Sequence, residues 1–267
     1  MGRPLRITYP GAFYHITSRG NEQKPVYKNK RDREKFLEYL ESATERYNAV
    51  IHLYCLMDNH YHLLIETPSA NLSQIMLHIN GAYTNYYNAK RGRAGHLFQG
   101  RYKAILVEKD VYAKELSRYI HLNPVRAGIV ERPEKYEWTS YPVYIGEKKK
   151  PEWLHTEFIH GYFGKTKSSS ERTYHKFVSL LINAEYNSPL DEVTGSAILG
   201  QADFISEIKE KYLSGKKADK EIPVLRVLAE RVSIEDIEKA VENNFSDTPA
   251  LAKKIKIYLS KRFTGER

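Results

Sequence analysis

Hydrophobic and polar positions in the first half of the chain follow strand and helix periodicities in turn. β-Branched and aromatic residues over 11–19 predict a strand, and apolar residues at helical spacing over 31–47 predict a helix. Two further strand-like runs, 49–57 and 60–66, are separated only by Asp58-Asn59, a dipeptide typical of hairpin turns. The pattern therefore predicts a strand, a helix and then a β-hairpin.

The same alternation continues to residue 122. An apolar stripe over 71–89 predicts a second helix, and residues 102–108 predict a fourth strand. Asp110 is suited to cap a third helix that runs to Leu122 and stops at Pro124. The order predicts an α+β protein of the ferredoxin-like (split βαβ) type, an antiparallel sheet with helices on one face and ligands on the other.

A change in composition near residue 146 predicts the end of this domain. Residues 1–145 are expected to form the first domain, 146–168 a linker rich in charge with Gly and Pro, and 169–267 an all-helical C-terminal region. Five helices are expected there: 169–186, 202–213, 223–231, 233–243 and 248–263.

Composition favours a nucleic-acid partner. The 267-residue chain has a formal net charge of +9, and it contains 21 Tyr, 9 Phe and 2 Trp. Cations neutralise phosphates and aromatic rings stack on unpaired bases, although a basic protein with its tyrosines in the core has the same composition. Cys55 is the only cysteine, which excludes an internal disulfide. With no signal peptide and no run of about 18 apolar residues, we expect a cytoplasmic protein without a membrane partner.

Two histidines in the third predicted strand are the first candidates for chemistry. His60 and His62 are two residues apart, so both side chains point to one face of the sheet. Two imidazoles can hold a divalent cation if another element supplies a third ligand. A solvated face or a hydrogen-bonded pair is the alternative that the spacing alone leaves open.

The third predicted helix carries the second group of candidates. Tyr119 and Asn123 are four residues apart and share a face, whereas His121 points away from it. Glu115 lies one turn before Tyr119 and is a possible second-shell or proton-accepting group, with an ordinary surface glutamate as the alternative. Most of the 21 tyrosines of such a chain serve packing.

These motifs together resemble a known family. The chain is similar to the REP-associated tyrosine transposases of the single-tyrosine HUH superfamily, which carry an IS200-like transposase domain. The resemblance covers about residues 5–145 and rests on four segments: Asn59-His60-Tyr61-His62, Arg118 to Gly128 (RYIHLNPVRAG), Phe98 to Lys103 and Ser18 to Asn21.

The resemblance implies a metal-dependent enzyme that cuts and rejoins single-stranded DNA beside hairpins. His60, His62 and Asn123 would bind the cation, and Tyr119 would form a 5′-phosphotyrosine intermediate. Neutral ligands and phosphate chemistry suit Mg²⁺ or Mn²⁺. The covalent link retains the energy of the broken phosphodiester bond, so no nucleotide cofactor is needed to rejoin the strand. We expect a bacterial, nucleoid-associated protein that acts as a monomer on REP-like palindromes.

DNA contacts are expected from basic and aromatic residues around the loop 90–109 and near the N-terminus. A solvated basic loop is the alternative. The candidates are Arg3, Arg6, Arg19, Asn21, Arg91, Arg93, Phe98, Arg101 and Lys103.

Two other functions share parts of this pattern. Replication initiators and relaxases use the same chemistry, but in relaxases the tyrosine usually precedes the histidine pair, and here it follows. A ferredoxin-like module that binds nucleic acid without cleaving it is the non-enzymatic alternative. The C-terminal helices are similar to an accessory region that leads into a DnaA-like helix-turn-helix, which we expect to be incomplete in this chain.

Overall fold

The computed structural model describes residues 6–184, 187–213, 234–245 and 249–263. Residues 6–214 form one compact unit, and the described residues beyond it belong to a second. In the second unit, helices α9 (Ile234–Phe245) and α10 (Pro249–Phe263) pack against each other. Arg3 and the helix expected over 223–231 lie outside the described residues.

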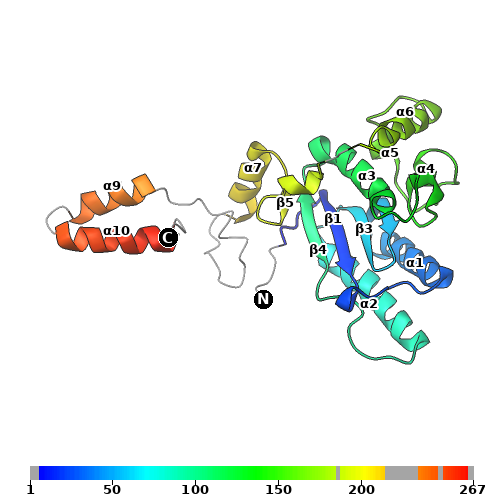
Figure 1. Ribbon diagram of the computed structural model, residues 1–267, viewed down its shortest axis with the longest axis horizontal. Coiled ribbons are helices and arrows are strands. Elements are labelled where there is room, and N and C mark those ends of the chain that lie inside the picture. Colours follow the sequence, from blue (N-terminus) through cyan, green and yellow to red (C-terminus); the bar gives the residue numbers. More distant parts are fainter. Residues whose placement is uncertain (1–5, 185–186, 214–233, 246–248, 264–267) are drawn as a thin grey trace. The chain divides into compact units, whose positions relative to one another are not determined.

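The compact unit is built on a mostly antiparallel five-stranded sheet. Strands β1 (Ala12–Arg19), β2 (Val50–Leu56), β3 (His60–Thr67), β4 (Lys103–Val107) and β5 (Ile198–Leu199) lie in the order β2-β3-β1-β4-β5. Figure 1 shows β4, β1 and β3 side by side. The first four strands have the ferredoxin-like order, which confirms the predicted fold class. The two-residue β5 adds a parallel edge that the sequence pattern did not predict.

Helices cover both faces of the sheet. Helices α1 (Lys30–Tyr47) and α2 (Leu72–Lys90) pack together on one face, where Phe36 contacts Tyr61 with ring centroids 4.8 Å apart. Helix α3 (Lys109–Arg126) lies on the other face, because its buried Leu116 and Ile120 join Leu64 in one core. The face expected to be free for ligands is thus partly covered by the helix that carries Tyr119.

Helix α3 runs past the expected stop. It includes Pro124 and ends at Arg126, so the predicted end at Leu122 is wrong. Proline has no backbone N–H, so Pro124 leaves one carbonyl of the preceding turn without its usual hydrogen-bond donor. Because this position is in the last turn of the helix, only one hydrogen bond is lost and the helix can continue to Arg126. Residue Asn123 therefore keeps helical geometry and stays on the face of Tyr119.

The chain after α3 adds short helices to the same core. Elements η2 (Pro133–Lys135), α4 (Tyr141–Tyr144), α5 (Glu157–His160) and α6 (Lys167–Ser179) follow, then η3 (Pro189–Glu192) and α7 (Ala202–Leu213). Helix α6 ends earlier than the expected 169–186. The boundaries expected at 145 and 168 stay predictions, although Leu154 forms a bridge with Ile51 of β2 and Tyr174 of α6 is fully buried. The short 3-10 turn η1 (Asn21–Gln23) follows β1.

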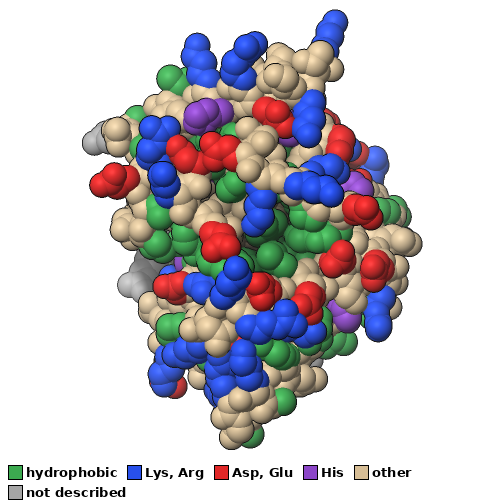
Figure 2. Space-filling view, turned by 90° about the vertical axis from the view of Figure 1, so that its right-hand side faces the viewer, with side chains coloured by type: hydrophobic (Ala, Val, Ile, Leu, Met, Phe, Trp, Pro, Cys, Tyr) green, Lys and Arg blue, Asp and Glu red, His purple; other side chains and the backbone are tan. Residues whose placement is uncertain are grey.

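The surface is mixed in charge on the face seen in Figure 2. Lys and Arg side chains are spread over it with Asp and Glu among them. Among the described residues, no helix combines the length and apolar character that crossing a membrane requires.

Candidate active site

The two motif histidines begin β3 on the face that α3 covers. In the antiparallel register His60 lies opposite Arg19 and His62 opposite Thr17. Their ring centroids are 5.1 Å apart. The His62 side chain is buried, with 5% of its surface exposed, and the His60 side chain is half-buried. The strand spacing therefore brings both imidazoles to one place, as predicted.

Each of the two histidines makes its recorded hydrogen bond through Nδ1. The Asn59 side-chain oxygen can only accept, so His60 Nδ1 donates to it over 2.7 Å and Nε2 keeps its lone pair. His62 Nδ1 lies 2.9 Å from His15 Nε2. His62 Nε2 is buried and has no hydrogen-bond partner within the described part of the chain. A ligand nitrogen whose other ring N–H is held by a neighbour is the usual arrangement at metal sites.

Burial keeps these imidazoles neutral. Desolvation lowers the pKa of His60 to about 4, helped by the nearby Arg19 guanidinium. Desolvation also lowers the pKa of His62 far below its usual range, and that of His15 to about 3. Neutral imidazole is the form that binds metal, so the site needs no deprotonation at neutral pH.

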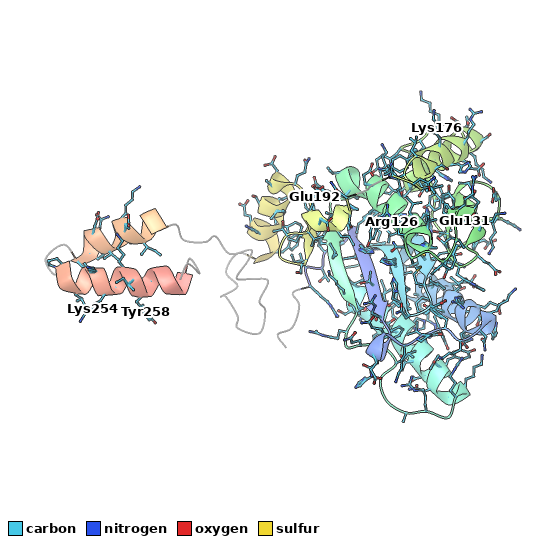
Figure 3. The ribbon with its side chains drawn as sticks, viewed as in Figure 1. Arg126, Glu131, Lys176, Glu192, Lys254 and Tyr258 are labelled. Atoms are coloured by element: carbon cyan, nitrogen blue, oxygen red, sulfur yellow. The ribbon has the colours of Figure 1, made fainter. Side chains whose placement is uncertain are left out.

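Tyr119 projects from the middle of α3 toward these histidines. Its ring meets His62 edge-on with centroids 5.9 Å apart, and His15 with centroids 6.3 Å apart. Burial raises the pKa of Tyr119, whereas Ser188, Arg126 and Asn123 lower it and Asp191 raises it. The Arg126 guanidinium carbon is 5.5 Å from the ring centroid of Tyr119. Figure 3 labels Arg126, in the last turn of α3.

Asn123 lies one turn after Tyr119 on the same helix face. Its Nδ2 donates to the Tyr119 backbone carbonyl over 2.9 Å, which leaves Oδ1 as an acceptor. Within the described ranges, no three His, Cys, Asp or Glu side chains are grouped to hold a metal ion. Asn123 Oδ1 is a neutral oxygen on the same helix face as Tyr119.

Glu115 and His121 of α3 both have partners within the protein. Glu115 forms a salt bridge with Arg118, one turn further along. His121, which was expected to point away from Tyr119, is fully buried. Its Nδ1 lies 2.6 Å from the Tyr174 hydroxyl and its Nε2 lies 2.8 Å from Ser140 Oγ. A role for Glu115 near the nucleophile stays a prediction.

The predicted DNA contacts divide by environment. Arg19, Asn21, Arg93, Arg101 and Lys103 are exposed, as a backbone contact requires.

Three other candidates make contacts within the protein. Arg91 forms a salt bridge with the fully buried Asp32, so its guanidinium joins α2 to α1. The Phe98 side chain is 6% exposed. Arg6 stacks on Tyr102, with its guanidinium carbon 3.8 Å from the ring centroid. Their contacts with DNA stay predictions.

The sequence pattern missed three residues around the site. His15 of β1 bonds His62, and Ser188 and Asp191 lie beside Tyr119 from the segment at η3. The predicted strand order places the first strand beside the third, and this signal could have pointed to His15. Ser188 and Asp191 follow a long stretch of chain without a periodic pattern, so no sequence signal placed them there.

A family model and a solved structure are similar to parts of this chain. A solved structure described as a REP-associated tyrosine transposase bound to a REP hairpin is 14% identical, covers 58% of this chain and 92% of its own, and has a TM-score of 0.48. Comparison with curated protein sequences gives no match. The family model described as "Transposase IS200 like" matches residues 8–123, a range that contains His60, His62, Tyr119 and Asn123. Residues 8–123 of this chain are therefore an IS200-like transposase domain.

Proposed function

We propose that this protein cuts and rejoins single-stranded DNA next to hairpins, with Tyr119 as the nucleophile. The observation that carries the proposal is the meeting of the Tyr119 ring with His62, which brings a phenol beside two neutral imidazoles in a domain of the IS200-like transposase family. We propose a monomer as the active form.

The reaction follows from the chemistry of a phenol and a phosphodiester. The Tyr119 hydroxyl loses its proton, and its oxygen forms a bond to phosphorus as the bond from phosphorus to the 3′-oxygen breaks. The departing 3′-oxygen takes up a proton and becomes a free 3′-hydroxyl. The protein then carries the 5′-phosphate on Tyr119. Attack by a 3′-hydroxyl on this phosphotyrosine reverses the step and rejoins the strand without a nucleotide cofactor.

His60, His62 and Asn123 are the residues we propose to hold a divalent cation, Mg²⁺ or Mn²⁺. Three observations support this assignment: the Nε2 lone pair of His60, the His62 Nε2 that has no hydrogen-bond partner among the described residues, and the Asn123 amide whose Nδ2 alone is recorded in a hydrogen bond. A cation bound there supplies charge neutralisation at a non-bridging phosphate oxygen. The chain's own task is to hold the Tyr119 oxygen in place, and Arg126 stabilises its phenolate form.

Hairpin DNA is the substrate that we propose. The solved structure described as a REP-associated tyrosine transposase holds a REP hairpin. The net charge of +9 and the exposed Arg19, Arg93 and Arg101 supply sequence-independent attraction for a phosphate backbone.

A covalent trapping experiment tests the proposal. The full chain is incubated with Mn²⁺ and a library of labelled hairpins with single-stranded flanks, and adducts are detected on a denaturing gel. We expect an adduct with the wild type and with Tyr39→Phe, a matched change on α1, and none with Tyr119→Phe. An adduct that survives Tyr119→Phe overturns the assignment of the nucleophile, and no adduct with any hairpin favours a binding module.

A further inference from the structure

A hollow lies between α2 and the loop 96–102, with a volume of 430 Å³. It opens on the face of the sheet opposite His60 and His62. One stripe of α2 forms a wall, with Ser73, Asn80, Gly81 and Thr84 at helical spacing. Volumes of about 300–1,000 Å³ are usual for sites that bind small ligands.

The charge of the hollow is positive. Arg6 and Arg101 line it, and no carboxylate does so among the described residues. Burial is the main cause that lowers the pKa of Arg6; Tyr102 raises this pKa, and the like charge of Arg101 lowers it. Arg6 Nη2 is buried without a hydrogen-bond partner in the described part of the chain. An anion at this point would relieve both the repulsion and the unmet donor.

The wall of the hollow is linked to the motif histidines. Tyr61 lies between His60 and His62 in sequence, and its side chain points to the opposite face. Its hydroxyl donates to Asn80 Oδ1 over 2.6 Å, which leaves the Asn80 amide N–H groups to donate to a ligand.

The loop that closes the hollow is tied to β1 near the same point. Gln99 N donates to the Arg19 carbonyl over 2.8 Å, and Arg19 lies opposite His60 in the sheet. The loop 96–102 is therefore joined through Arg19 to the end of the sheet that carries His60.

Gly81 leaves the wall of the hollow open. It lies inside α2, where a Cβ atom would meet nothing within 4 Å, so packing does not require a glycine. Glycine in a helix interior costs about 1 kcal/mol relative to alanine. The missing side chain leaves space where a ligand can approach the helix backbone.

We propose that this hollow binds one unpaired nucleotide of the same DNA strand, with its base against α2 and its phosphate at Arg6 and Arg101. Amide donors, an aromatic ring with the Arg6 guanidinium stacked on it, and the second guanidinium of Arg101 suit a base and a phosphate better than an acidic peptide, which lacks a flat ring. The inference rests on the proposed function for the source of the strand.

Filling the hollow tests the inference. The full chain, without divalent cation, is titrated against a labelled random-sequence DNA strand of about twelve nucleotides, and binding is followed by fluorescence anisotropy. Gly81→Leu places a side chain in the hollow. We expect it to weaken binding about ten-fold, because stacking on a protein contributes about 1–3 kcal/mol per base.

Two control variants separate filling from other effects. Gly81→Ala changes the helix but leaves most of the volume, and Gln74→Leu adds the same side chain at an exposed position of α2 outside the hollow. Both are expected to bind within about two-fold of the wild type, a change smaller than the loss of one stacked base. Equal binding by Gly81→Leu, or an equal loss in Gln74→Leu, overturns the inference.

Arg6→Met gives an independent measurement if Gly81→Leu fails to fold. Loss of one phosphate contact should reduce the slope of log affinity against log salt by about 0.7. An unchanged slope contradicts the phosphate contact. The binding titration needs neither the cation nor Tyr119. If the variants bind DNA as the wild type does while the Tyr119 adduct still forms, only the nucleotide site in the hollow is rejected. If Gly81→Leu or Arg6→Met weakens DNA binding but no Tyr119 adduct forms, only the proposed cleavage is rejected.

Discussion

At the scale of single residues, the environment of Tyr119 decides how it can act. Burial raises its pKa, which makes the phenol a poor nucleophile at neutral pH unless a positive charge offsets the effect. Arg126 is the cation placed to do so, 5.5 Å from the ring centroid. The resemblance to a known family singled out Tyr119 as the candidate nucleophile. It did not single out this partner, because Arg126 was expected beyond the end of the helix.

Replacing Arg126 should shift the pH dependence of cleavage. In Arg126→Gln the phenolate loses a stabilising charge, so the pKa of Tyr119 rises and the alkaline rise in rate moves to higher pH. A change of one pKa unit corresponds to about ten-fold in rate at neutral pH. Single-turnover cleavage across pH measures it, with the exposed Arg31→Gln on α1 as control. An unchanged pH profile contradicts the role of Arg126.

The histidine pair is tested through the cation itself. His60→Ala should weaken Mn²⁺ binding and reduce cleavage by more than about 100-fold, since even second-shell changes cost 10–100-fold at metal sites. Hairpin binding should remain. Electron paramagnetic resonance titration of Mn²⁺ measures the affinity, and His78→Ala on α2 serves as a matched histidine change. Equal Mn²⁺ affinity in His60→Ala would remove His60 from the ligand set.

At the scale of elements, buried polar bonds fix the orientation of α3. His121 joins α3 to Tyr174 of α6 and to Ser140, so the face with Tyr119 is held toward β3. The sequence predicted which face each residue occupies, since helical spacing determines that directly. The sequence did not predict that α6 packs against α3. A single tyrosine such as Tyr174 in a polar helix gives the same sequence pattern whether its side chain is buried or half-buried.

His121 should make stability depend on pH. Burial lowers its pKa to about 3, against 6.5 in an unfolded chain. Below pH 6.5 His121 becomes protonated in the unfolded chain but stays neutral in the folded chain, so the free energy of unfolding falls with decreasing pH. The slope is about 1.4 kcal/mol per pH unit for each such imidazole.

Replacing His121 measures how much this imidazole contributes to the pH dependence of the free energy of unfolding. His121→Phe keeps an aromatic ring in the core. In cation-free buffer between pH 6 and 4, the free energy of unfolding of this variant should fall less steeply with decreasing pH, by the contribution of one imidazole. Urea unfolding at several pH values measures the slope. An identical slope in variant and wild type would show that His121 is not the buried neutral group described here.

At the scale of the whole molecule, the order of strands and helices was predictable and the extent of the core was not. Periodicity over residues 11–122 determined the ferredoxin-like order because each element is long enough to show its repeat. Strand β5 and helices α4 and α5 are too short for that. Their contacts with β4, β2 and α3 come from distant parts of the chain, which a local pattern cannot reveal.

Truncation tests where the catalytic unit ends. A chain of residues 1–214 should fold and form the Tyr119 adduct, because it retains the compact unit. A chain of residues 1–145 lacks Tyr174, which is fully buried beside α3, and we expect it to unfold at a lower temperature and to form less adduct. Circular dichroism and the gel assay measure both. Equal stability would place the boundary at 145, as the sequence suggested.

The central claim is that Tyr119 becomes joined to DNA. Trypsin cleaves after Arg118 and Arg126, so Tyr119 lies alone among tyrosines in the peptide Tyr119–Arg126. After incubation with hairpin DNA and Mn²⁺, nuclease digestion and mass spectrometry locate the attached nucleotide. The account predicts a 5′-linked nucleotide on this peptide. A nucleotide on a peptide that contains a different tyrosine would contradict it.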